Sequence, residues 1–383
     1  MKVEHVITRL IIGGAQENTL STVLGLRAIP GVDVKLISGP TSGPEGTLEP
    51  VARSVEGLFE IEPDLVRPVS PLHDLKALIS LTHRFKTTQP QIVHTHSGKA
   101  GIIGRLAAAL AYVPCIIHGI HGPSFGNFQG AFPNFIYRNA ERLAGRFTRH
   151  FIVVANAMRD QYLQAGIGRP EQYTRIFSGF NLAPYLSARN DLKLREHYGI
   201  RPDDIVIGKI ARLFFLKGHD ELFAVAPRII QAEPRVKFLL IGDGILRQKF
   251  EEQLEALHIR DHFIFTGLVP PTQIPKLTGI MNLLVHLSFR EGLPRALPQA
   301  LAAGKPVVAF DCDGAREVCV NDQTGFLVPP RDQEKLAQSL IALVRDPALR
   351  KQLGSQGREY VTQRFSEQTM VRQTYELYQK LLS

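Results

Sequence analysis

The sequence has few cysteines and no tryptophan: three cysteines stand among 383 residues, at Cys115, Cys312 and Cys319. None of them belongs to a Cys-x-x-Cys pair or stands near histidines at the spacing of zinc ligands. The cysteines therefore indicate neither a disulfide framework nor a structural zinc site. Sparse, unpaired cysteine is typical of a reducing compartment, so we expect a cytoplasmic protein.

Long apolar segments are lacking as well. The first residues include Lys2, Glu4 and Arg9, which interrupt the apolar stretch that a signal peptide needs. The most apolar stretch, residues 101–120, is broken by Arg105 and His118 and does not suit a membrane-spanning helix. The sequence predicts neither a signal peptide nor a membrane span.

Low-complexity tracts are also absent. The 32 glycines and 25 prolines are spread along the chain, and 44% of the residues are hydrophobic while 21% are charged. This composition is that of a folded globular chain and not of a collagen-like or disordered one. A chain of 383 residues exceeds what one hydrophobic core usually serves, so we expect two domains.

Positive charge is in excess. The net charge is +9, and residues 1–190 hold 19 Lys and Arg against 13 Asp and Glu. Such a bias attracts nucleic acid, anionic lipid or phosphorylated substrates. No zinc-finger, RNA-recognition or basic-zipper motif accompanies the charge, so we expect no nucleic-acid partner.

One basic segment, residues 135–150, has helical spacing. It can lie on an anionic membrane surface, or it can be the solvated cationic face of a helix packed on the core. The sequence leaves both interpretations open. The arginines are Arg138, Arg142, Arg146 and Arg149, and the apolar residues are Phe135, Leu143 and Phe147.

Short β-branched runs alternate with segments of helical periodicity, which predicts parallel sheets with right-handed crossovers. The helical segments include 75–85, 220–230, 246–257 and 333–344. The expected strands of the first half are Val3–Ile7, Val34–Ile37, Ile92–Thr95, Cys115–Gly119, Phe151–Val154 and Thr174–Phe177. Those of the second half are Ile205–Ile210, Val236–Ile241, Phe263–Phe265, Leu283–Leu287, Pro306–Phe310 and Phe326–Val328.

A polar, charge-rich stretch separates the two sets of strands. It follows Pro184 and runs over residues 186–201. We therefore expect an α/β protein with two doubly wound domains joined near residues 184–200. In such sheets ligands bind at the carboxyl ends of the strands, so the loops that follow the strands are the places to look for chemistry.

The first strand runs into a loop with Gly13 and Gly14. Glycines between a strand and a helix let the backbone approach an anionic ligand closely, although a plain tight turn has the same residues. The loop lacks the G-x-G-x-x-G fingerprint, and no acidic residue ends the second strand. Both absences count against a nicotinamide-dependent dehydrogenase.

Four histidines stand at the ends of expected strands: His94, His96, His118 and His121. A His-x-His pair on a strand points both rings to one face, which suits a metal ion. No Asp or Glu lies nearby to orient or complete such a site, so we favour histidines that line a cleft and assign no metal.

Arg212 follows a strand in the second half, and Lys217 precedes a helix that opens at Gly218-His219-Asp220. A guanidinium fork, an ammonium and the free amides of a helix start together form a trap for a diphosphate. Two solvated surface cations are the alternative.

Glu291 follows the apolar strand 283–287 and precedes Gly292, Leu293 and Pro294. A carboxylate in this loop can hold sugar hydroxyls, while the amides after it donate to sugar or phosphate oxygens. A helix-capping glutamate is the alternative. The Asp311-Cys312-Asp313 tripeptide matches an Asp-x-Asp metal motif, but this spacing is common by chance.

Together these residues resemble the family 4 glycosyltransferases of the GT-B fold, in particular the bacterial capsule, exopolysaccharide and lipopolysaccharide enzymes. The likeness covers nearly the whole chain and rests on six motifs in order. They are the Gly13-Gly14 loop, VHTHSGKAGIIGRLAA from Val93, HGIHG from His118, Arg212 with Lys217-Gly218-His219, EGLPRALPQALAAGKPVVAFDCDGAREV from Glu291, and TGFLVPPRD from Thr324.

The resemblance implies an α/β GT-B architecture of two Rossmann-like domains with a cleft between them. Residues 1–185 and a returning last helix, 366–383, would form the acceptor-side domain. Residues 190–365 would form the domain that binds the nucleotide sugar. The implied reaction is metal-independent transfer of a hexose from a nucleoside diphosphate sugar, with retention of configuration and no cofactor.

The resemblance also implies roles for individual residues. Arg212 and Lys217 would neutralise the diphosphate, Glu291 would hold the sugar hydroxyls, and His121 would position and polarise groups near the reacting sugar. No general base is assigned, because the leaving phosphate can accept the proton. Further donor contacts would come from Gly13, Gly14, Gly267, Leu268, Gly292, Leu293 and Pro294, and the acceptor side would include Gln16, His96 and Lys99.

One position departs from the family pattern. Gln299 stands where the family has a second glutamate that grips the ribose, and an amide offers one acceptor oxygen instead of a charged pair. Two alternatives to the transferase therefore stay open. One is a nucleotide-sugar epimerase of the same fold, and the other is a catalytically silent binding subunit. The expected acceptor is a cell-surface glycan precursor. It would be linked to a lipid, and the basic first domain would bind it at an anionic membrane.

Overall fold

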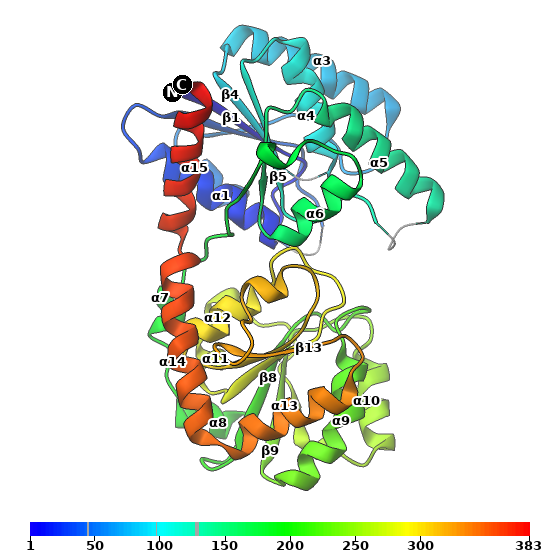
Figure 1. Ribbon diagram of the computed structural model, residues 1–383, viewed down its shortest axis with the longest axis vertical. Coiled ribbons are helices and arrows are strands. Elements are labelled where there is room, and N and C mark those ends of the chain that lie inside the picture. The colour runs from blue at the N-terminus through cyan, green and yellow to red at the C-terminus, as the bar shows by residue number, and fades with distance from the viewer. Residues whose placement is uncertain (44–45, 97, 127–129) are drawn as a thin grey trace. The chain divides into compact units, whose positions relative to one another are not determined.

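A computed structural model describes residues 1–43, 46–96, 98–126 and 130–383. Its contacts divide the chain into two units, Met1–Gly179 with Glu367–Ser383, and Phe180–Ser366 (Figure 1). The first unit ends earlier than Pro184, because the Phe180 N–H donates to the Phe365 carbonyl oxygen at 2.8 Å and so ties residue 180 to the second unit.

The first unit is built on a parallel sheet of seven strands in the order β3-β2-β1-β4-β5-β6-β7. Six of the strands correspond to the expected ones. The sequence missed β3, which has three partly exposed residues and too short an apolar run to be recognised. The strands are β1 (Lys2–Ile7), β2 (Asp33–Ser38), β3 (Phe59–Ile61), β4 (Ile92–His96), β5 (Cys115–Ile120), β6 (His150–Val153) and β7 (Tyr173–Arg175).

Helices connect these strands, and the C-terminal helix α15 (Glu367–Leu382) packs against α1 (Gly14–Arg27). Met370 and Tyr378 of α15 are buried in the same core as Val3 and Leu20. The last helix is thus part of the first unit. The other helices are α2 (Glu49–Arg53), α3 (Pro71–Thr88), α4 (Gly98–Leu110), α5 (Ala131–Gly145) and α6 (Asn156–Gln164).

The second unit has a parallel sheet of six strands in the order β10-β9-β8-β11-β12-β13. Its inner strands are mostly apolar on both faces, as is typical of parallel strands covered on two sides, with buried Lys209 in β8 and His286 in β11 as exceptions. The strands are β8 (Ile205–Ile210), β9 (Val236–Ile241), β10 (Phe263–Phe265), β11 (Leu283–His286), β12 (Val307–Phe310) and β13 (Gly325–Val328).

Aspartate caps account for three helix starts in this unit. The Asp191, Asp332 and Asp346 carboxylates cap the first turns of α8, α13 and α14, where backbone N–H groups have no partner within the helix. The helices are α7 (Ala183–Leu186), α8 (Leu192–His197), α9 (His219–Ala232), α10 (Arg247–Ala256), α11 (Ile274–Gly279), α12 (Ala296–Ala302), α13 (Gln333–Arg345) and α14 (Pro347–Arg364).

The predicted α/β class with two doubly wound parallel sheets is confirmed. In each sheet the strand order reverses beside the first strand: β1 lies between β2 and β4, and β8 lies between β9 and β11. Ligands of such sheets bind outside the carboxyl ends at this reversal point. In the described part of the chain, no helix combines the length and apolar character needed to cross a membrane.

Candidate functional site

In the second unit, the loops after β8 and β11 are joined at the carboxyl edge of the sheet. The Phe289 N–H donates to the Leu216 carbonyl oxygen at 2.9 Å. Gly218 has a φ of +64°, and a Cβ atom there would lie 2.1 Å from the Leu287 carbonyl oxygen. Only glycine fits this close approach, so Gly218 holds Lys217 against the loop that carries Glu291.

Lys217 and Glu291 form an ion pair in which the ammonium nitrogen lies 2.6 Å from Oε1 of the carboxylate. Both side chains are about one quarter exposed. The Glu291 backbone N–H donates to Oδ2 of Asp313 at 2.8 Å, which fixes the loop. Two residues that the sequence assigned separately, one to the diphosphate and one to the sugar, are thus in direct contact.

His286, at the end of β11, lies beside this pair with its Nε2 atom 3.6 Å from Oε1 of Glu291. Burial by itself raises the pKa of the Glu291 carboxyl, but His286 and Lys217 lower the pKa by more, to well below its usual value. Glu291 is therefore ionised at neutral pH and can accept hydrogen bonds from sugar hydroxyls.

Lys209, which the sequence analysis missed, lies in β8 with only 2% of its surface exposed. Burial, and then the charge of Lys217, lowers the pKa of its ammonium to about 7, against an opposing effect of Glu291. A lysine in an otherwise apolar buried strand is unusual, because the charged form loses its hydration. This interruption of the apolar run was the signal available in the sequence.

Three further buried side chains of this region have polar atoms without hydrogen-bond partners. They are both ring nitrogens of His219, Nε2 of His286 and the Ser288 hydroxyl. An unpartnered buried polar atom costs roughly 1–3 kcal/mol. His286 and Ser288 stand at the end of β11 and just after it, whereas the His219 ring stacks on Phe250 in the core of the second unit.

Three further predicted donor residues, Arg212, Gly267 and Leu268, lie in loops of the same unit. Arg212 is exposed directly after β8, with its guanidinium 5.5 Å from the centre of the Phe214 ring. Gly267 follows β10, has a φ of +69° and pairs with Gly242 after β9. Leu268 next to it is largely exposed.

The loop from Glu291 leads into α12 through Gly292, Leu293 and Pro294. Leu293 and Pro294 are buried, so mainly the backbone of this turn is offered to a ligand. Gln299 is buried inside α12 with 7% of its surface exposed.

The two carboxylates of the Asp-x-Asp tripeptide have protein partners. Asp311 forms an ion pair with Arg316 at 2.8 Å, and Asp313 accepts the Glu291 N–H. These contacts give the motif a role in holding the loops of the second unit.

In the first unit, the loop after β1 brings Gly13 and Gly14 to the start of α1. The Gly13 carbonyl oxygen accepts the Glu17 N–H at 2.9 Å, and a Cβ atom at Gly13 would lie 2.8 Å from Oε1 of Gln16. Gln16 therefore folds back over the glycine loop.

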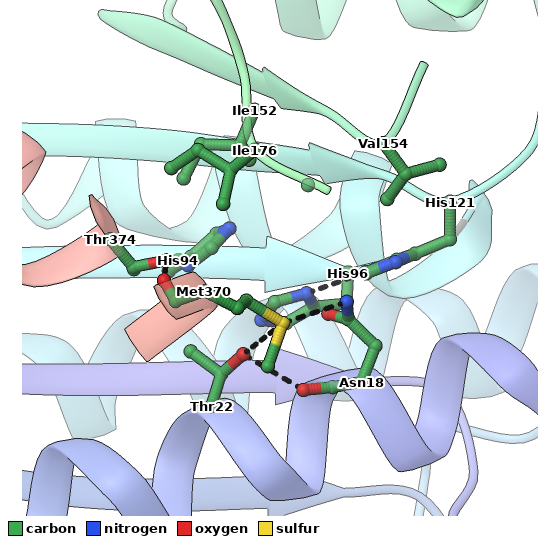
Figure 2. A pocket seen from close by; sticks show the side chains of 11 residues that line it. Asn18, Thr22, His94, His96, His121, Ile152, Val154, Ile176, Met370 and Thr374 are labelled. Carbon is green, nitrogen blue, oxygen red and sulfur yellow. Dashed lines mark hydrogen bonds between the residues drawn. The ribbon is translucent and has the colours of Figure 1, made fainter. Parts of the chain in front are cut away.

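His96 and His121 come together at the carboxyl edge of this sheet, with His96 Nδ1 3.0 Å from His121 Nε2. Burial lowers the pKa of His121 to about 4 and that of His96 well below its usual value, so both rings are neutral at physiological pH. They line a small cavity together with His94, Met370 and residues of β6 (Figure 2).

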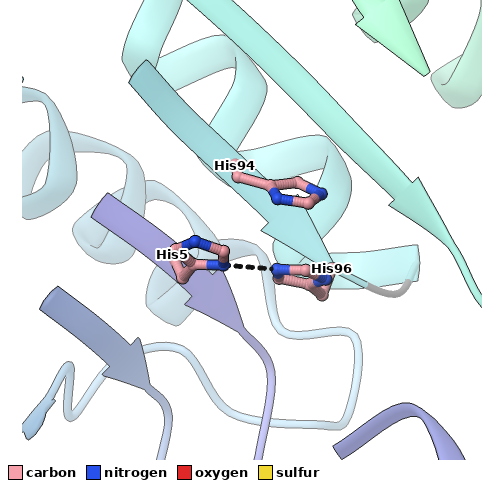
Figure 3. A group of neighbouring side chains, drawn as sticks. All are labelled: His5, His94 and His96. Carbon is pink, nitrogen blue, oxygen red and sulfur yellow. Dashed lines mark hydrogen bonds between the residues drawn. The ribbon is translucent and has the colours of Figure 1, made fainter. Parts of the chain in front are cut away.

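His5, His94 and His96 offer ring nitrogens within 4.8 Å of one another, as the ligands of one metal ion would (Figure 3). His5 Nδ1 and His96 Nε2 are 2.8 Å apart and hydrogen-bonded. Both ring nitrogens of His5 and both of His96 are engaged in hydrogen bonds. One of these hydrogen bonds joins two members of the cluster, and the others lead to His121 and Tyr378.

Lys99, expected on the acceptor side, is engaged elsewhere. Its ammonium forms an ion pair with Asp74 of α3 and donates to the Pro68 carbonyl oxygen. The sequence gave no sign of this contact, because Asp74 lies far from Lys99 along the chain.

Two family models match the chain. Residues 12–183 match the model described as Glycosyltransferase Family 4, and residues 190–360 match the model described as Glycosyl transferases group 1. The two matches cover both units.

Relatives of known role are similar over most of their length. The UDP-Gal:alpha-D-GlcNAc-diphosphoundecaprenol alpha-1,3-galactosyltransferase of Escherichia coli is 27% identical over 358 residues, which are 91% of this chain and 89% of that protein. The capsular polysaccharide biosynthesis glycosyltransferase CapM of Staphylococcus aureus is 26% identical over 326 residues, with 82% and 83% covered. Among solved structures, HepE of Anabaena in complex with UDP shares the fold, with a TM-score of 0.84 at 23% identity over 99% of this chain and 100% of that one.

Proposed function

Because the chain belongs to the family 4 glycosyltransferases and has their GT-B fold, we propose that it transfers a hexose from a nucleoside diphosphate sugar to a cell-surface polysaccharide precursor with retention of configuration. The observation that carries the proposal is the Lys217–Glu291 ion pair at the carboxyl edge of the second unit. In this proposal Lys217 is the cation that binds the phosphate, and Glu291 is the carboxylate that binds the sugar.

The donor is proposed to bind along the loops of the second unit. Lys217 and Arg212 neutralise the diphosphate, and the Glu291 carboxylate accepts hydrogen bonds from the sugar hydroxyls. The backbone of Gly292 and Leu293 donates to the same ligand, and Gln299 replaces a carboxylate at the ribose. The exposed turn at 267–268 contacts the base of the nucleotide.

Charge stabilisation is proposed to supply most of the catalysis. When the bond between the sugar's anomeric carbon and the diphosphate breaks, negative charge grows on the leaving oxygen, and preorganised cations stabilise it. The acceptor hydroxyl forms the new bond on the same face of the sugar. Its proton passes to the leaving diphosphate, so that no protein base and no metal ion is needed.

The first unit is proposed to bind the acceptor. Gln16 and His96 lie at the carboxyl edge of its sheet, and His121 follows β5 at the same edge. A neutral imidazole at His121 can accept a hydrogen bond from a hydroxyl and so polarise it. Gly13 and Gly14 are proposed to donate backbone N–H groups to the donor phosphates.

The exposed face of α5 supports an acceptor that is held on a membrane. Large apolar side chains of α5 and of the turn after it are exposed, and exposed Arg142 and Arg146 lie between them. Glu141 and Ala144 of the same helix are buried against the core. One face of the helix thus packs on the core, and the membrane contact of the exposed face is our proposal. The exposed apolar residues are Phe132, Phe135, Ile136, Leu143 and Phe147.

An amphipathic surface of this kind binds anionic lipid through buried apolar area and charge attraction. The name of the E. coli relative specifies a diphosphoundecaprenol-linked acceptor. We therefore propose a lipid-linked acceptor and peripheral attachment to an anionic membrane from the cytoplasmic side. The three free cysteines support that compartment.

Product analysis tests the proposed reaction. The purified protein is incubated with nucleoside diphosphate sugars, alone and with a polyprenyl diphosphate-linked sugar acceptor, in the presence of EDTA. Transfer that requires the acceptor and proceeds in EDTA supports the proposal. Interconversion of the donor without an acceptor would show the epimerase, and no turnover with any donor would show the silent subunit.

A further inference from the structure

A positively charged hollow lies in the first unit, apart from the residues assigned to the donor and the acceptor. Its volume is about 370 Å³, which is within the range of small-molecule sites. The end of α5 forms one wall, and the segment between α6 and β7 forms the other. Three of the residues that line it are Arg142, Arg146 and Arg169, and the rest are three glycines and a glutamine. We call it the arginine pocket.

The arginine pocket lies at the amino edge of the sheet. Its lining residues 145–146 precede β6, and its lining residues 166–172 precede β7. His96 and His121 lie instead at the carboxyl edge, where β4 ends and where β5 has ended. Because all strands of this sheet are parallel, the two edges are on opposite sides. A ligand of the arginine pocket is therefore separate from the proposed acceptor site.

Glycines let the wall before β7 pack closely on the core. Gly166 and Gly168 have φ values of +70° and +66°, which glycine adopts without strain. A Cβ atom at Gly168 would lie 2.8 Å from the Phe151 ring, and one at Gly145 would lie 3.0 Å from Ile167. Between the arginines, the pocket is therefore lined by backbone that rests directly on apolar side chains.

Hydrogen bonds hold the two walls together. Nε of Arg142 donates to the Ala165 carbonyl oxygen at 2.6 Å. The Gln172 side chain accepts the Arg169 N–H at 3.0 Å and donates to the Thr148 carbonyl oxygen at 3.0 Å. The arginines are thus brought to one hollow by contacts of the protein itself, and a ligand finds the pocket already formed.

Positive charge is in excess in the arginine pocket. Arg169 forms an ion pair with Glu171 at 2.9 Å, but both side chains are largely exposed and such a pair contributes little. In the described part of the chain, no carboxylate or carbonyl oxygen pairs with the Arg146 guanidinium. Glu141 of α5 is buried and bound by Arg105, so it does not neutralise the pocket. The pocket therefore attracts an anion.

Arginines near the end of a helix also offset the helix dipole. This function accounts for Arg142, which binds the carbonyl oxygen at the end of α6. It does not account for Arg146, which binds no carbonyl oxygen of the described chain, or for Arg169, which lies beyond α6. Guanidinium groups that line one hollow suit an anion with several oxygens, and a phosphate matches the guanidinium fork.

Apolar side chains beside the pocket indicate that the phosphate belongs to a lipid. Leu143 and Phe147 follow Arg142 and Arg146 directly in the chain, and each is about half exposed. They continue the exposed apolar face of α5 to the pocket. A soluble phosphate compound makes no use of exposed apolar side chains, whereas a phospholipid has its acyl chains next to its phosphate.

We propose that the arginine pocket binds the phosphate of an anionic phospholipid headgroup while Leu143 and Phe147 enter the acyl layer beside it. The proposal rests on the membrane attachment in the proposed function and adds a specific phosphate site to it. A headgroup held in the pocket fixes the C-terminal end of α5 at the membrane.

Substitutions of matched charge separate this site from diffuse charge attraction. Binding of the full chain to vesicles of phosphatidylcholine and phosphatidylglycerol is measured as a partition coefficient. Arg146→Gln should weaken binding about tenfold or more, as loss of a hydrogen bond to a charged group does. Arg149→Gln is the control, because Arg149 is exposed on the same segment but does not line the pocket. It should cost no more than about fivefold, the effect of one diffuse charge near an anionic membrane.

Two further variants sharpen the test. Arg146→Lys keeps the charge but lacks the guanidinium fork, so it should still bind more weakly than the unsubstituted protein. Arg169→Gln, on the other wall, should cause a loss similar to that of Arg146→Gln. Equal losses in Arg146→Gln and Arg149→Gln, or full binding by Arg146→Lys, would overturn the pocket.

Calorimetric titration with inorganic phosphate distinguishes the lipid from a soluble phosphate compound. If Arg146→Gln lost phosphate binding but kept its vesicle binding, the pocket would serve a soluble compound and the proposal would be overturned. If the unsubstituted protein bound no vesicles, the proposed membrane attachment would fall together with the lipid site. Vesicle binding that is equal in all variants would refute the pocket alone, and product analysis tests the transfer reaction independently of both.

Discussion

The Lys217 ammonium lies 2.6 Å from Oε1 of Glu291, although 74 positions separate the two residues in the chain. The order of the sheet explains the contact, because β8 and β11 are neighbours and the loops that follow them leave the same edge. In the proposed complex, the Lys217 ammonium would contact both the diphosphate and Glu291. The other lone pairs of the Glu291 carboxylate would accept hydrogen bonds from the sugar hydroxyls. Four of the predictions below follow from this site and its surroundings, and a fifth concerns the exposed face of α5.

Glu291→Gln should lower kcat by about a hundredfold or more, the range that follows when one preorganised electrostatic group is lost. The amide keeps the size of the side chain but gives up the charge that pairs with Lys217. Release of nucleoside diphosphate in the presence of acceptor measures the effect. Glu334→Gln is the control, since its carboxylate pairs with Arg228 on the exposed surface, and it should retain full activity. Equal activity of the two variants would refute the assignment of Glu291.

Lys209 should make nucleotide binding depend on pH. Its pKa of about 7 in the folded protein lies far below that of a free lysine, so the ammonium loses its proton as the pH rises above neutral. A bound diphosphate favours the charged form. Binding should therefore take up a proton, and affinity should fall between about pH 7 and about pH 9. Calorimetry in buffers of different ionisation enthalpy measures this uptake, which Lys209→Met should abolish.

The same lysine should affect stability with a defined sign. Its pKa is lower in the folded state than in the unfolded state, so the unfolded state binds more protons between these two values, and the free energy of unfolding rises with pH there. Lys209→Met should reduce this rise and be more stable than the unsubstituted protein at neutral pH. Denaturant unfolding at several pH values compares the two, and identical pH slopes would contradict the prediction.

Gly218→Ala should destabilise the protein and weaken donor binding. A methyl group at this position would lie 2.1 Å from the Leu287 carbonyl oxygen, so the loop that holds Lys217 must move. Gly199→Ala is the matched control, because Gly199 has a similar positive φ and open space around it. We expect Gly218→Ala to cost at least ~1 kcal/mol more, as overpacking typically does. Equal thermal midpoints would show that the loop is free to shift.

Replacement of Phe132 and Phe135 together by Asp should abolish binding to vesicles with anionic lipid, because it removes apolar area and adds opposing charge on the exposed face of α5. Co-flotation at low salt measures binding. Ile245→Asp, at an exposed apolar position of the second unit, is the control and should bind as the unsubstituted protein does. Flotation of the double variant at the control level would contradict attachment through α5.

The sequence predicted the fold class well because hydrophobic periodicity is local. The apolar runs at 205–210 and 283–286 identify strands without knowledge of the rest of the chain. The short strand β3 was not predicted, because three residues are too few to show a hydrophobic period. The positions of Glu291 and Lys217 after strands were recognisable, whereas their contact depends on strand order, which no local pattern encodes.

The burial and the partners of these polar residues could not be predicted from local sequence. In the sequence, Lys209 is only a cation within an apolar strand. Its burial results from the packing of the second unit. His5 and Tyr378 stand at opposite ends of the chain, and α15 brings them together in the first unit. Lys99 was assigned to the acceptor side from its place in a motif, but its ammonium is paired with Asp74, a contact set by the packing of α3 on α4.

The central claim is that the second unit binds a nucleoside diphosphate at Lys217 without a metal ion. Thermal unfolding with UDP, GDP, ADP or NAD, each with and without EDTA, tests it most directly, because a ligand at about 100 times its Kd adds roughly 2.7 kcal/mol to the free energy of unfolding. We predict that one nucleoside diphosphate raises the Tm equally with and without EDTA, and that Lys217→Met loses the rise. Stabilisation by NAD alone, or a rise that EDTA removes, would contradict the account.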